Sequence, residues 1–98
     1  MLFRSPSVLI SGGDVKEGKP SPAGYLLAAR ALGHAIADAV VFEDSAAGVT
    51  AGHTAGAKVV GVANWSLAGN HRLEFWVPDF TALSVDIKSE YGLTIRLR

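Results

Sequence analysis

The sequence contains no cysteine, which excludes a disulfide-stabilised scaffold, a thiolate metal site and a cysteine nucleophile. It also lacks an excess of either charge, because 9 basic residues balance 9 acidic ones. No bulk field therefore attracts nucleic acid or an anionic membrane surface. The first apolar stretch, residues 1–10, is short and is interrupted at residues 5–7, so it predicts neither a secretory signal nor a membrane span. These absences favour a cytoplasmic protein with no nucleic-acid or membrane partner.

The length of the chain, 98 residues, allows one small domain with one modest core. Hydrophobic residues make up 49% of the sequence and charged residues 18%, which is the composition of a globular protein and not of a disordered segment. This apolar content is high for so short a chain. We therefore expect a single domain over residues 1–98 that leaves some apolar surface for a partner.

Apolar runs alternate with helix signals along the first part of the chain. Val40, Val41 and Phe42 follow one another without a polar residue, a pattern typical of a strand buried on both faces of a parallel sheet. Ser21 and Pro22 are a capping residue and a first-turn proline, which together predict a helix start. The predicted strands are residues 8–10, 40–42 and 58–63, and the predicted helices are residues 22–32 and 46–55. This β-α-β-α-β order predicts parallel strands joined by right-handed crossovers.

The pattern changes beyond this core, which extends over residues 8–64. We predict a C-terminal extension at residues 65–98, with a short strand at residues 75–77 and a helical turn at residues 80–83. The tail at residues 93–97 alternates apolar and polar side chains, which is typical of a strand with one buried and one wet face. We expect this tail to be an edge strand.

Two adjacent carboxylates, Glu43 and Asp44, directly follow the central predicted strand. In open α/β sheets, ligands bind just beyond the carboxyl ends of the strands. Two carboxylates placed there repel each other unless a hard cation such as Mg²⁺ lies between them. The alternative is a plain helix start, because acidic residues favour a helix N-terminus and Ser45 is a good N-cap. The dipeptide alone is compatible with both interpretations.

Lys19 lies between Gly18 and Pro20 and is the second candidate site residue. Residues 13–19 match the first part of a nucleotide-binding G-x4-G-K loop, but Pro20 stands where that loop needs Ser or Thr to bind Mg²⁺ and phosphate. We therefore do not predict a nucleotide triphosphate site. A lysine held between a glycine and a helix start is a positioned cation, which can neutralise a phosphoryl group in transfer. The alternative is a solvated surface lysine.

Small residues dominate the second predicted helix, at residues 46–55. Gly48 and Gly52 are four positions apart and lie on one face of that helix. We interpret both glycines as sites of close packing between the helix and the sheet, without a role in chemistry.

Three separated blocks occur in order along the sequence. They are Gly-Lys-Pro-Ser-Pro at 18–22 with Tyr25, Val-Phe-Glu-Asp-Ser at 41–45 with Gly48, and the segment at 55–62. Together these blocks resemble one family, the haloacid dehalogenase-like (HAD) phosphatases. The resemblance is closest to the sugar-phosphate and glycerol-phosphate phosphatases and the phosphoglucomutase-like group. It implies that Lys19 contacts the nucleophile and the transferring phosphate. It also implies that Asp44 holds Mg²⁺, with Glu43 beside the ion or one water away.

The signature that opens the chemistry of this family is absent from the sequence. That signature, D-x-D-x-[TV], contains an Asp nucleophile and an acid/base Asp two residues later. No two aspartates of this chain have that spacing; they are Asp14, Asp38, Asp44, Asp79 and Asp86. The Ser/Thr motif and the cap domain of the family are missing as well. The resemblance therefore implies an α/β fold, a partial Rossmann-like three-layer α/β/α domain with parallel strands that lacks the first two core strands and the cap.

The missing strands have a consequence for the sheet. The sheet order of the family resembles 5-4-1-2-3, so the predicted strand at residues 8–10 would be separated from the strand at 40–42 by two strands that this chain lacks. We expect either a displaced first strand, a repacked sheet or an open gap whose edges recruit a partner.

The resemblance implies a function for the complete enzyme, which is hydrolysis of a small sugar or polyol phosphate through an aspartyl-phosphate, with Mg²⁺ as cofactor. For this chain alone we expect a phosphatase fragment without turnover. The alternative is a non-catalytic interaction module, or a truncated regulator of a full-length phosphatase, that uses an exposed sheet edge to bind a protein partner.

Overall fold

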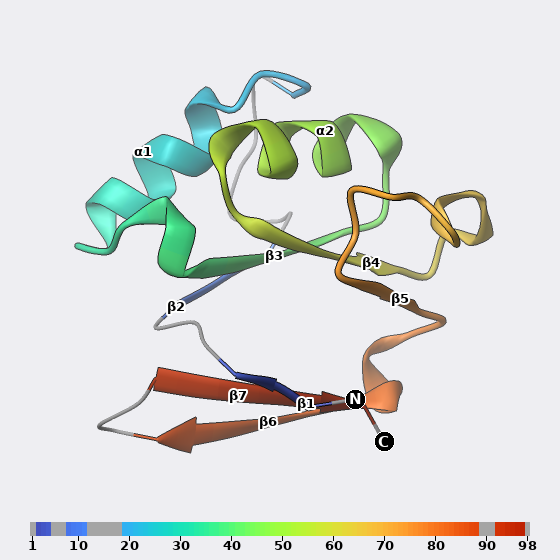
Figure 1. Cartoon of the computed structure of the whole chain (residues 1–98). Coiled ribbons are helices and arrows are strands. Elements are labelled where there is room, and N and C mark those ends of the chain that lie inside the picture. Colours follow the sequence, from blue (N-terminus) through green and yellow to red (C-terminus); the bar gives the residue numbers. More distant parts are fainter. Residues whose placement is uncertain (1, 5–7, 12–18, 89–91, 98) are drawn as a thin grey trace.

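The computed structural model describes the backbone of residues 2–4, 8–11, 19–88 and 92–97, and the side chains of residues 19–84. Two sheets and two α-helices make up most of this part of the chain (Figure 1). Among the described residues, no helix has the length and apolar character needed to cross a membrane.

A parallel sheet forms the centre of the molecule. Its strand order is β2-β3-β4-β5, and every neighbouring pair is parallel. The strands are β2 (Val8–Ser11), β3 (Ala39–Glu43), β4 (Lys58–Val62) and β5 (Phe75–Val77). Between the first three of them lie helices α1 (Ala23–Ala31) and α2 (Ala46–Ala55). The predicted β-α-β-α-β order and the α/β fold class are therefore confirmed, as is the short strand at 75–77.

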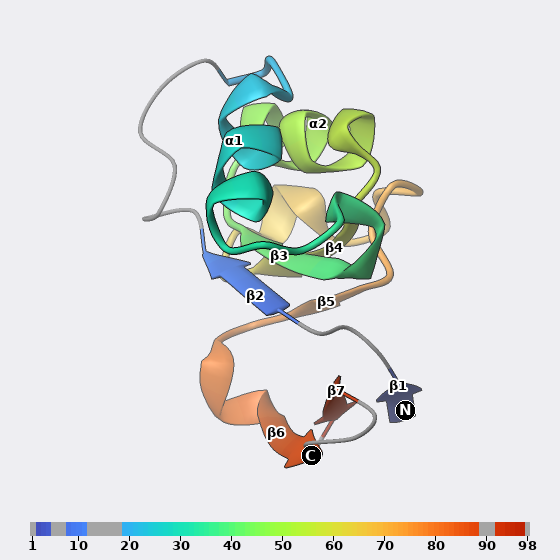
Figure 2. The ribbon, with the colours of Figure 1, turned by 90° about the vertical axis from the view of Figure 1, so that its left-hand side faces the viewer.

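Both α-helices lie on the same face of this sheet (Figures 1 and 2). The chain moves in one direction from β2 to β3 to β4, and right-handed crossovers made in one direction place all their helices on one face. Helices on the second face would require the strand order to reverse, which the described strands do not do. The described part of this Rossmann-like α/β fold therefore has its α-helical layer on one face of the parallel sheet.

The other side of the parallel sheet faces a small antiparallel sheet (Figure 1). This sheet has the order β1-β7-β6 and contains β1 (Leu2–Arg4), β6 (Leu83–Lys88) and β7 (Gly92–Leu97). The alternating tail is thus the central strand β7, and the prediction of an edge strand is wrong. An alternating pattern of apolar and polar residues indicates that the two faces of a strand differ in burial. It does not indicate how many neighbouring strands pair with it, because that depends on where the other strands of the chain lie.

Strand β2 pairs directly with β3, with Val8 opposite Ala39 and Ile10 opposite Val41. The gap of two strands that the resemblance implied is therefore not present, and the first strand is displaced to the neighbouring position. Unpaired backbone groups in the middle of a sheet are costly, and pairing with β2 satisfies one side of β3. As a result β2 is an edge strand of the parallel sheet.

Local signals account for the helix ends. At the start of α1 the Ser21 hydroxyl accepts a hydrogen bond of 3.2 Å from the backbone N–H of Ala23. At its end Gly33 adopts a φ of 76°, a left-handed conformation that glycine takes without strain. Helix α2 begins at Ser45, whose hydroxyl accepts from the backbone N–H of Gly48 at 3.0 Å. The predicted capping role of Ser45 is confirmed, and the hydroxyl of Ser21 accepts a backbone N–H at the predicted start of α1.

Buried side chains lie on both faces of the parallel sheet, and every residue of β3 is buried. This confirms the expectation for residues 40–42. The face under the helices has the buried cluster Tyr25, Ala29, Ala39, Val41, Val49, Ala51, Ala57, Val59 and Leu67. The opposite face has Val40, Phe42, Val60, Val62, Val77 and Leu83.

Short 3₁₀ turns connect the remaining segments; they are η2 (Ile36–Asp38), η3 (Trp65–Leu67) and η4 (Phe80–Ala82). The last of them confirms the helical turn predicted near residue 80. Asp79 caps it by accepting hydrogen bonds from the hydroxyl and the backbone N–H of Thr81. These bonds favour the charged carboxylate and lower the pKa of Asp79 below its ordinary value.

Candidate active site

Glu43 is the last residue of β3, and its side chain is buried on the helical side of the sheet. Only 1% of this side chain is exposed. One carboxylate oxygen, Oε1, lies 2.7 Å from the ammonium nitrogen of Lys19. The buried hydroxyl of Tyr25, in α1, donates a hydrogen bond to the same oxygen. The fold therefore gives this carboxylate both a cationic and a neutral donor, as a buried charge requires.

Lys19 reaches this carboxylate from just before α1. Its side chain is 23% exposed, and its ammonium nitrogen also lies 5.7 Å from the centre of the Tyr25 ring. The Lys19–Pro20 peptide bond is cis. Lys19 and Glu43 are 24 positions apart in the sequence, so only the tertiary fold brings these two predicted site residues together. The alternative of an isolated surface lysine does not describe Lys19.

Gly48, in the first turns of α2, lies against the other side of the Glu43 carboxylate. A Cβ atom at this position would overlap with Oε2 and Cδ of Glu43. Gly52, one turn later, packs closely on the sheet, since a Cβ there would lie 2.9 Å from a methyl carbon of Val59. The close-packing interpretation therefore describes Gly52, whereas Gly48 makes room for a charged group of the candidate site.

Asp44 follows Glu43 directly but is exposed, at the carboxyl end of β3. Its backbone carbonyl accepts a hydrogen bond of 3.0 Å from the side-chain amide of Asn64. Asn64 follows β4, so this bond ties together the ends of two neighbouring strands. No hydrogen bond to the Asp44 carboxylate comes from the described part of the chain. The two adjacent carboxylates thus point to different environments, Glu43 inward and Asp44 outward.

A magnesium ion would find few ligands among the described residues. They contain no group of three or more His, Cys, Asp or Glu side chains able to surround a metal ion. Glu43 has its Oε1 engaged by two donors and its other oxygen against Gly48, which does not fit direct coordination. Asp44 does fit, because it offers an exposed hard oxygen ligand, and Mg²⁺ commonly uses one or two carboxylates and several waters.

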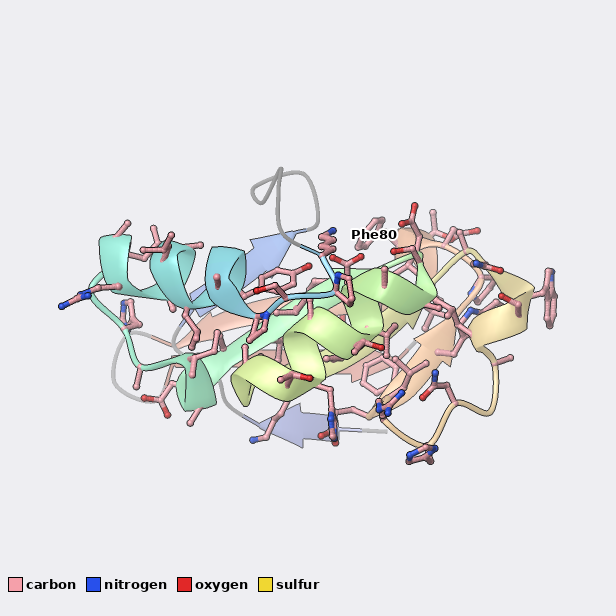
Figure 3. All side chains as sticks on the ribbon, turned by 90° about the horizontal axis from the view of Figure 1, so that it is seen from above. Phe80 is labelled. Atoms are coloured by element: carbon pink, nitrogen blue, oxygen red, sulfur yellow. The ribbon has the colours of Figure 1, made fainter. Side chains whose placement is uncertain are left out.

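Aromatic side chains flank this end of the sheet. Phe80, labelled in Figure 3, is 58% exposed, and its ring centre lies 5.5 Å from that of Phe42. Trp65 is 74% exposed and stacks on Trp76, with ring centres 4.5 Å apart. Trp76 also donates its indole N–H to the backbone carbonyl of Asn64 at 2.9 Å. Exposed aromatic side chains therefore lie on the segments that follow β4 and β5.

Residues 2–56 match a family model described as haloacid dehalogenase-like hydrolase. This match covers more than half of the chain and includes Lys19, Glu43, Asp44 and Gly48. The chain belongs to the haloacid dehalogenase-like hydrolases.

Individual relatives are phosphatases by name. The chain is 43% identical to glycerol-1-phosphate phosphohydrolase 2 of Saccharomyces cerevisiae, over 62% of this chain and 27% of that protein. It is 36% identical to 2-deoxyglucose-6-phosphate phosphatase 2 of the same yeast, over 94% of this chain and 42% of that protein. A crystal structure of a HAD hydrolase, family IA, variant 3, from Entamoeba histolytica superposes with a TM-score of 0.64 at 30% identity, covering 70% of this chain and 33% of that one.

The HAD-like chain thus spans less than half the length of these relatives. Within it, the fold brings Lys19 and Glu43 into contact and leaves Asp44 exposed beside them. Reasoning from the sequence missed the contributions of Tyr25 and Gly48 to this site. The available signals were a tyrosine on an otherwise apolar helix face and a glycine one turn after the acidic pair. Neither signal shows that Tyr25 and Gly48 contact the carboxylate of Glu43.

Proposed function

We propose that this HAD-like chain carries the phosphate- and magnesium-binding portion of a phosphomonoester phosphatase. The observation that carries the proposal is the placement of Lys19, held by Glu43, and the exposed Asp44 at the carboxyl end of one buried strand. The names of its relatives, which act on glycerol phosphate and 2-deoxyglucose 6-phosphate, favour a small sugar or polyol phosphate as substrate. A cytoplasmic location is part of the proposal.

In this proposal each residue has one role. The Lys19 ammonium offsets charge on the phosphoryl oxygens, and the buried Glu43 carboxylate holds that ammonium in place. Asp44 is a Mg²⁺ ligand, and the ion, when bound, stabilises the charge of the transferring phosphoryl group. The Asp nucleophile that would form the aspartyl-phosphate must come from outside these 98 residues, because they contain no D-x-D pair. We therefore expect no phosphate release by this chain alone.

The first prediction concerns the metal. On titration of the ¹⁵N-labelled chain with Mg²⁺, we expect saturable shifts of the amide signals of Asp44 and Ser45, and of Glu43 next to them. A hard cation binds carboxylate oxygens, and Asp44 has the exposed carboxylate at this place. In Asp44→Asn, the changes that Mg²⁺ causes in these signals should be only a small fraction of those in the wild type, because the amide removes the negative charge.

Asp38→Asn is a matched control, since Asp38 is also an exposed aspartate just outside β3, at its opposite end. This variant should respond to Mg²⁺ as the wild type does. An Mg²⁺ response that survives Asp44→Asn, or the lack of any response in a folded wild-type chain, would contradict the metal assignment. Phosphate release from sugar phosphates by the isolated chain would contradict the expected lack of turnover.

A second candidate function is a non-catalytic module that binds a full-length phosphatase. The specific observation is the position of β2 at the edge of the parallel sheet, where one side of a strand is available for pairing with another chain. We propose that a partner would extend the sheet at this strand.

Hydrogen exchange tests this second candidate. When the chain is mixed with a full-length HAD-like phosphatase, we expect slower exchange of the backbone amides of β2 (Val8–Ser11), by about tenfold or more for a stable strand pair. The amides of β4, an interior strand, serve as the internal reference and should not change. Unchanged exchange in β2 at saturating partner would exclude strand addition there.

A further inference from the structure

The hydroxyl group of Tyr25 has no explanation in packing. Tyr25 is fully buried and its neighbours in the cluster under the helices are apolar. Phenylalanine would fill the same apolar space without a polar atom. Burying a hydroxyl is unfavourable unless it makes a hydrogen bond, and the bond that Tyr25 makes is to the Glu43 carboxylate. The role of the Tyr25 hydroxyl is therefore to donate a hydrogen bond to this carboxylate.

The Glu43 carboxylate is confined from two sides. Its Oε1 accepts from both Lys19 and Tyr25, which uses the two lone pairs of that oxygen. Its Oε2 lies where a side chain at Gly48 would have to be. Helix α1 thus holds the carboxylate through Tyr25, and helix α2 holds it through the bare backbone at Gly48. The carboxylate has one available orientation between the two helices.

This confinement extends to Lys19. A lysine side chain has many rotamers and loses conformational entropy when it is held in one of them. The side chain of Lys19 is 23% exposed, and its ammonium group is held by one anion among the described residues, Glu43. If that anion could rotate, the ammonium would move with it. The position of Lys19 at the carboxyl end of the sheet therefore depends on what fixes Glu43.

We propose that Tyr25 is a positioning residue for Lys19 and acts on it through the Glu43 carboxylate. The hydroxyl fixes Oε1 of Glu43, and Oε1 in turn fixes the ammonium group of Lys19. The placement of Lys19 follows from the contacts alone, whereas its use against a phosphoryl group rests on the proposed function.

The test measures the reactivity of Lys19 in Tyr25→Phe. The full chain is treated with acetic anhydride, and acetylation of each lysine is followed by mass spectrometry over time. A lysine side chain held against a carboxylate reacts slowly, because it must leave that contact before it can reach the reagent. We expect Lys19 to react about tenfold faster in Tyr25→Phe than in the wild type, near the lower end of the range for losing one hydrogen bond to a charged group. Lys58, on β4, is the reference lysine and should react at an unchanged rate.

Two further variants separate positioning from loosening of the helix. Ala29→Gly weakens α1 in the same buried cluster without touching Glu43, so it should leave Lys19 as protected as in the wild type. Glu43→Gln removes the charge that holds Lys19, and adding Tyr25→Phe to it should increase the rate by less than twofold. Equal Lys19 rates in wild type and Tyr25→Phe would overturn the proposal, as would an equal increase in Ala29→Gly.

The outcome is independent of the proposed phosphatase function, because labelling is done without Mg²⁺ or phosphate. A chain that shows the expected labelling but no Mg²⁺ response would retain Tyr25 as a positioning residue and lose the metal assignment. A chain that responds to Mg²⁺ but shows equal Lys19 labelling in wild type and Tyr25→Phe would retain the metal assignment and reject the role of Tyr25.

Discussion

We expect Glu43→Gln to lower the free energy of unfolding by about 3 kcal/mol, the lower end of the range for removing one member of a buried ion pair. The glutamine amide keeps the shape of the side chain and an oxygen that can accept from Tyr25. It removes the negative charge 2.7 Å from the Lys19 ammonium. Lys19 is 23% exposed and regains part of its hydration, which is why we place the loss at the lower end. Urea denaturation followed by circular dichroism measures it.

The matched control for this prediction is the double variant Glu43→Gln with Lys19→Met. Replacing both charges by neutral groups of similar size is often close to neutral, because the desolvation penalty of the pair disappears together with its attraction. We therefore expect the double variant to recover most of the stability lost in Glu43→Gln. A single variant as stable as the wild type would show that the Lys19–Glu43 contact is not maintained in solution.

The second large effect is expected for Gly48→Ala. Alanine in a helix is usually more stable than glycine by about 1 kcal/mol. Here its Cβ atom would overlap with Oε2 and Cδ of Glu43, and overpacking of this kind costs about 1–3 kcal/mol. The carboxylate has little freedom to move away, because Lys19 and Tyr25 hold its Oε1. Because the overlap is severe, we expect a net loss of about 1–2 kcal/mol. An ordinary helix glycine would instead be stabilised by the change to alanine.

A double-mutant cycle identifies the cause of that loss. In a Glu43→Ala background the carboxylate is gone, so Gly48→Ala should be neutral or stabilising by up to about 1 kcal/mol. Lys19 should also become more reactive toward acetic anhydride in Gly48→Ala, since the anion that holds it has moved. A loss of the same size in both backgrounds would assign the effect to another contact of α2.

These experiments also address why the chain contains this ion pair at all. A buried charged pair is rarely more stable than well-packed apolar residues in its place. The Lys19–Glu43 pair is therefore better explained by what it positions than by what it adds to stability. Its location fits this explanation, because the carboxyl end of β3 is where a parallel sheet places its ligands. The match of residues 2–56 to the HAD-like hydrolases includes both residues.

Local features of the sequence determined the secondary structure. The β-branched and aromatic run at residues 40–42 forms β3, and the helix predicted at residues 46–55 is α2. Ser45 and Gly56 bound that helix as a hydroxyl cap and a left-handed stop. These elements were predictable because each depends on side chains within a few positions of one another. The presence of Lys19, Glu43 and Asp44 in the candidate site was predictable for the same reason, since their motifs are local.

Only the tertiary structure decided which of these elements became neighbours. The short run at residues 8–10 has no feature that selects its partner, yet it pairs with β3 and closes the expected gap. The alternation at residues 93–97 predicts a strand, but its central place in the second sheet depends on β1 and β6. Strand pairing is made by backbone groups that every residue has, so the pattern of side chains does not specify it.

The same distinction separates the two carboxylates of the candidate site. The sequence by itself placed Glu43 and Asp44 side by side at the end of a buried strand. It did not determine that Glu43 turns inward to Lys19 and Tyr25 while Asp44 remains exposed. That difference arises because α1 and α2 pack on one face of β3 and bring a cation, a hydroxyl and a bare glycine backbone around one carboxylate. Contacts between residues far apart in the chain are a property of the packed fold, and no local pattern encodes them.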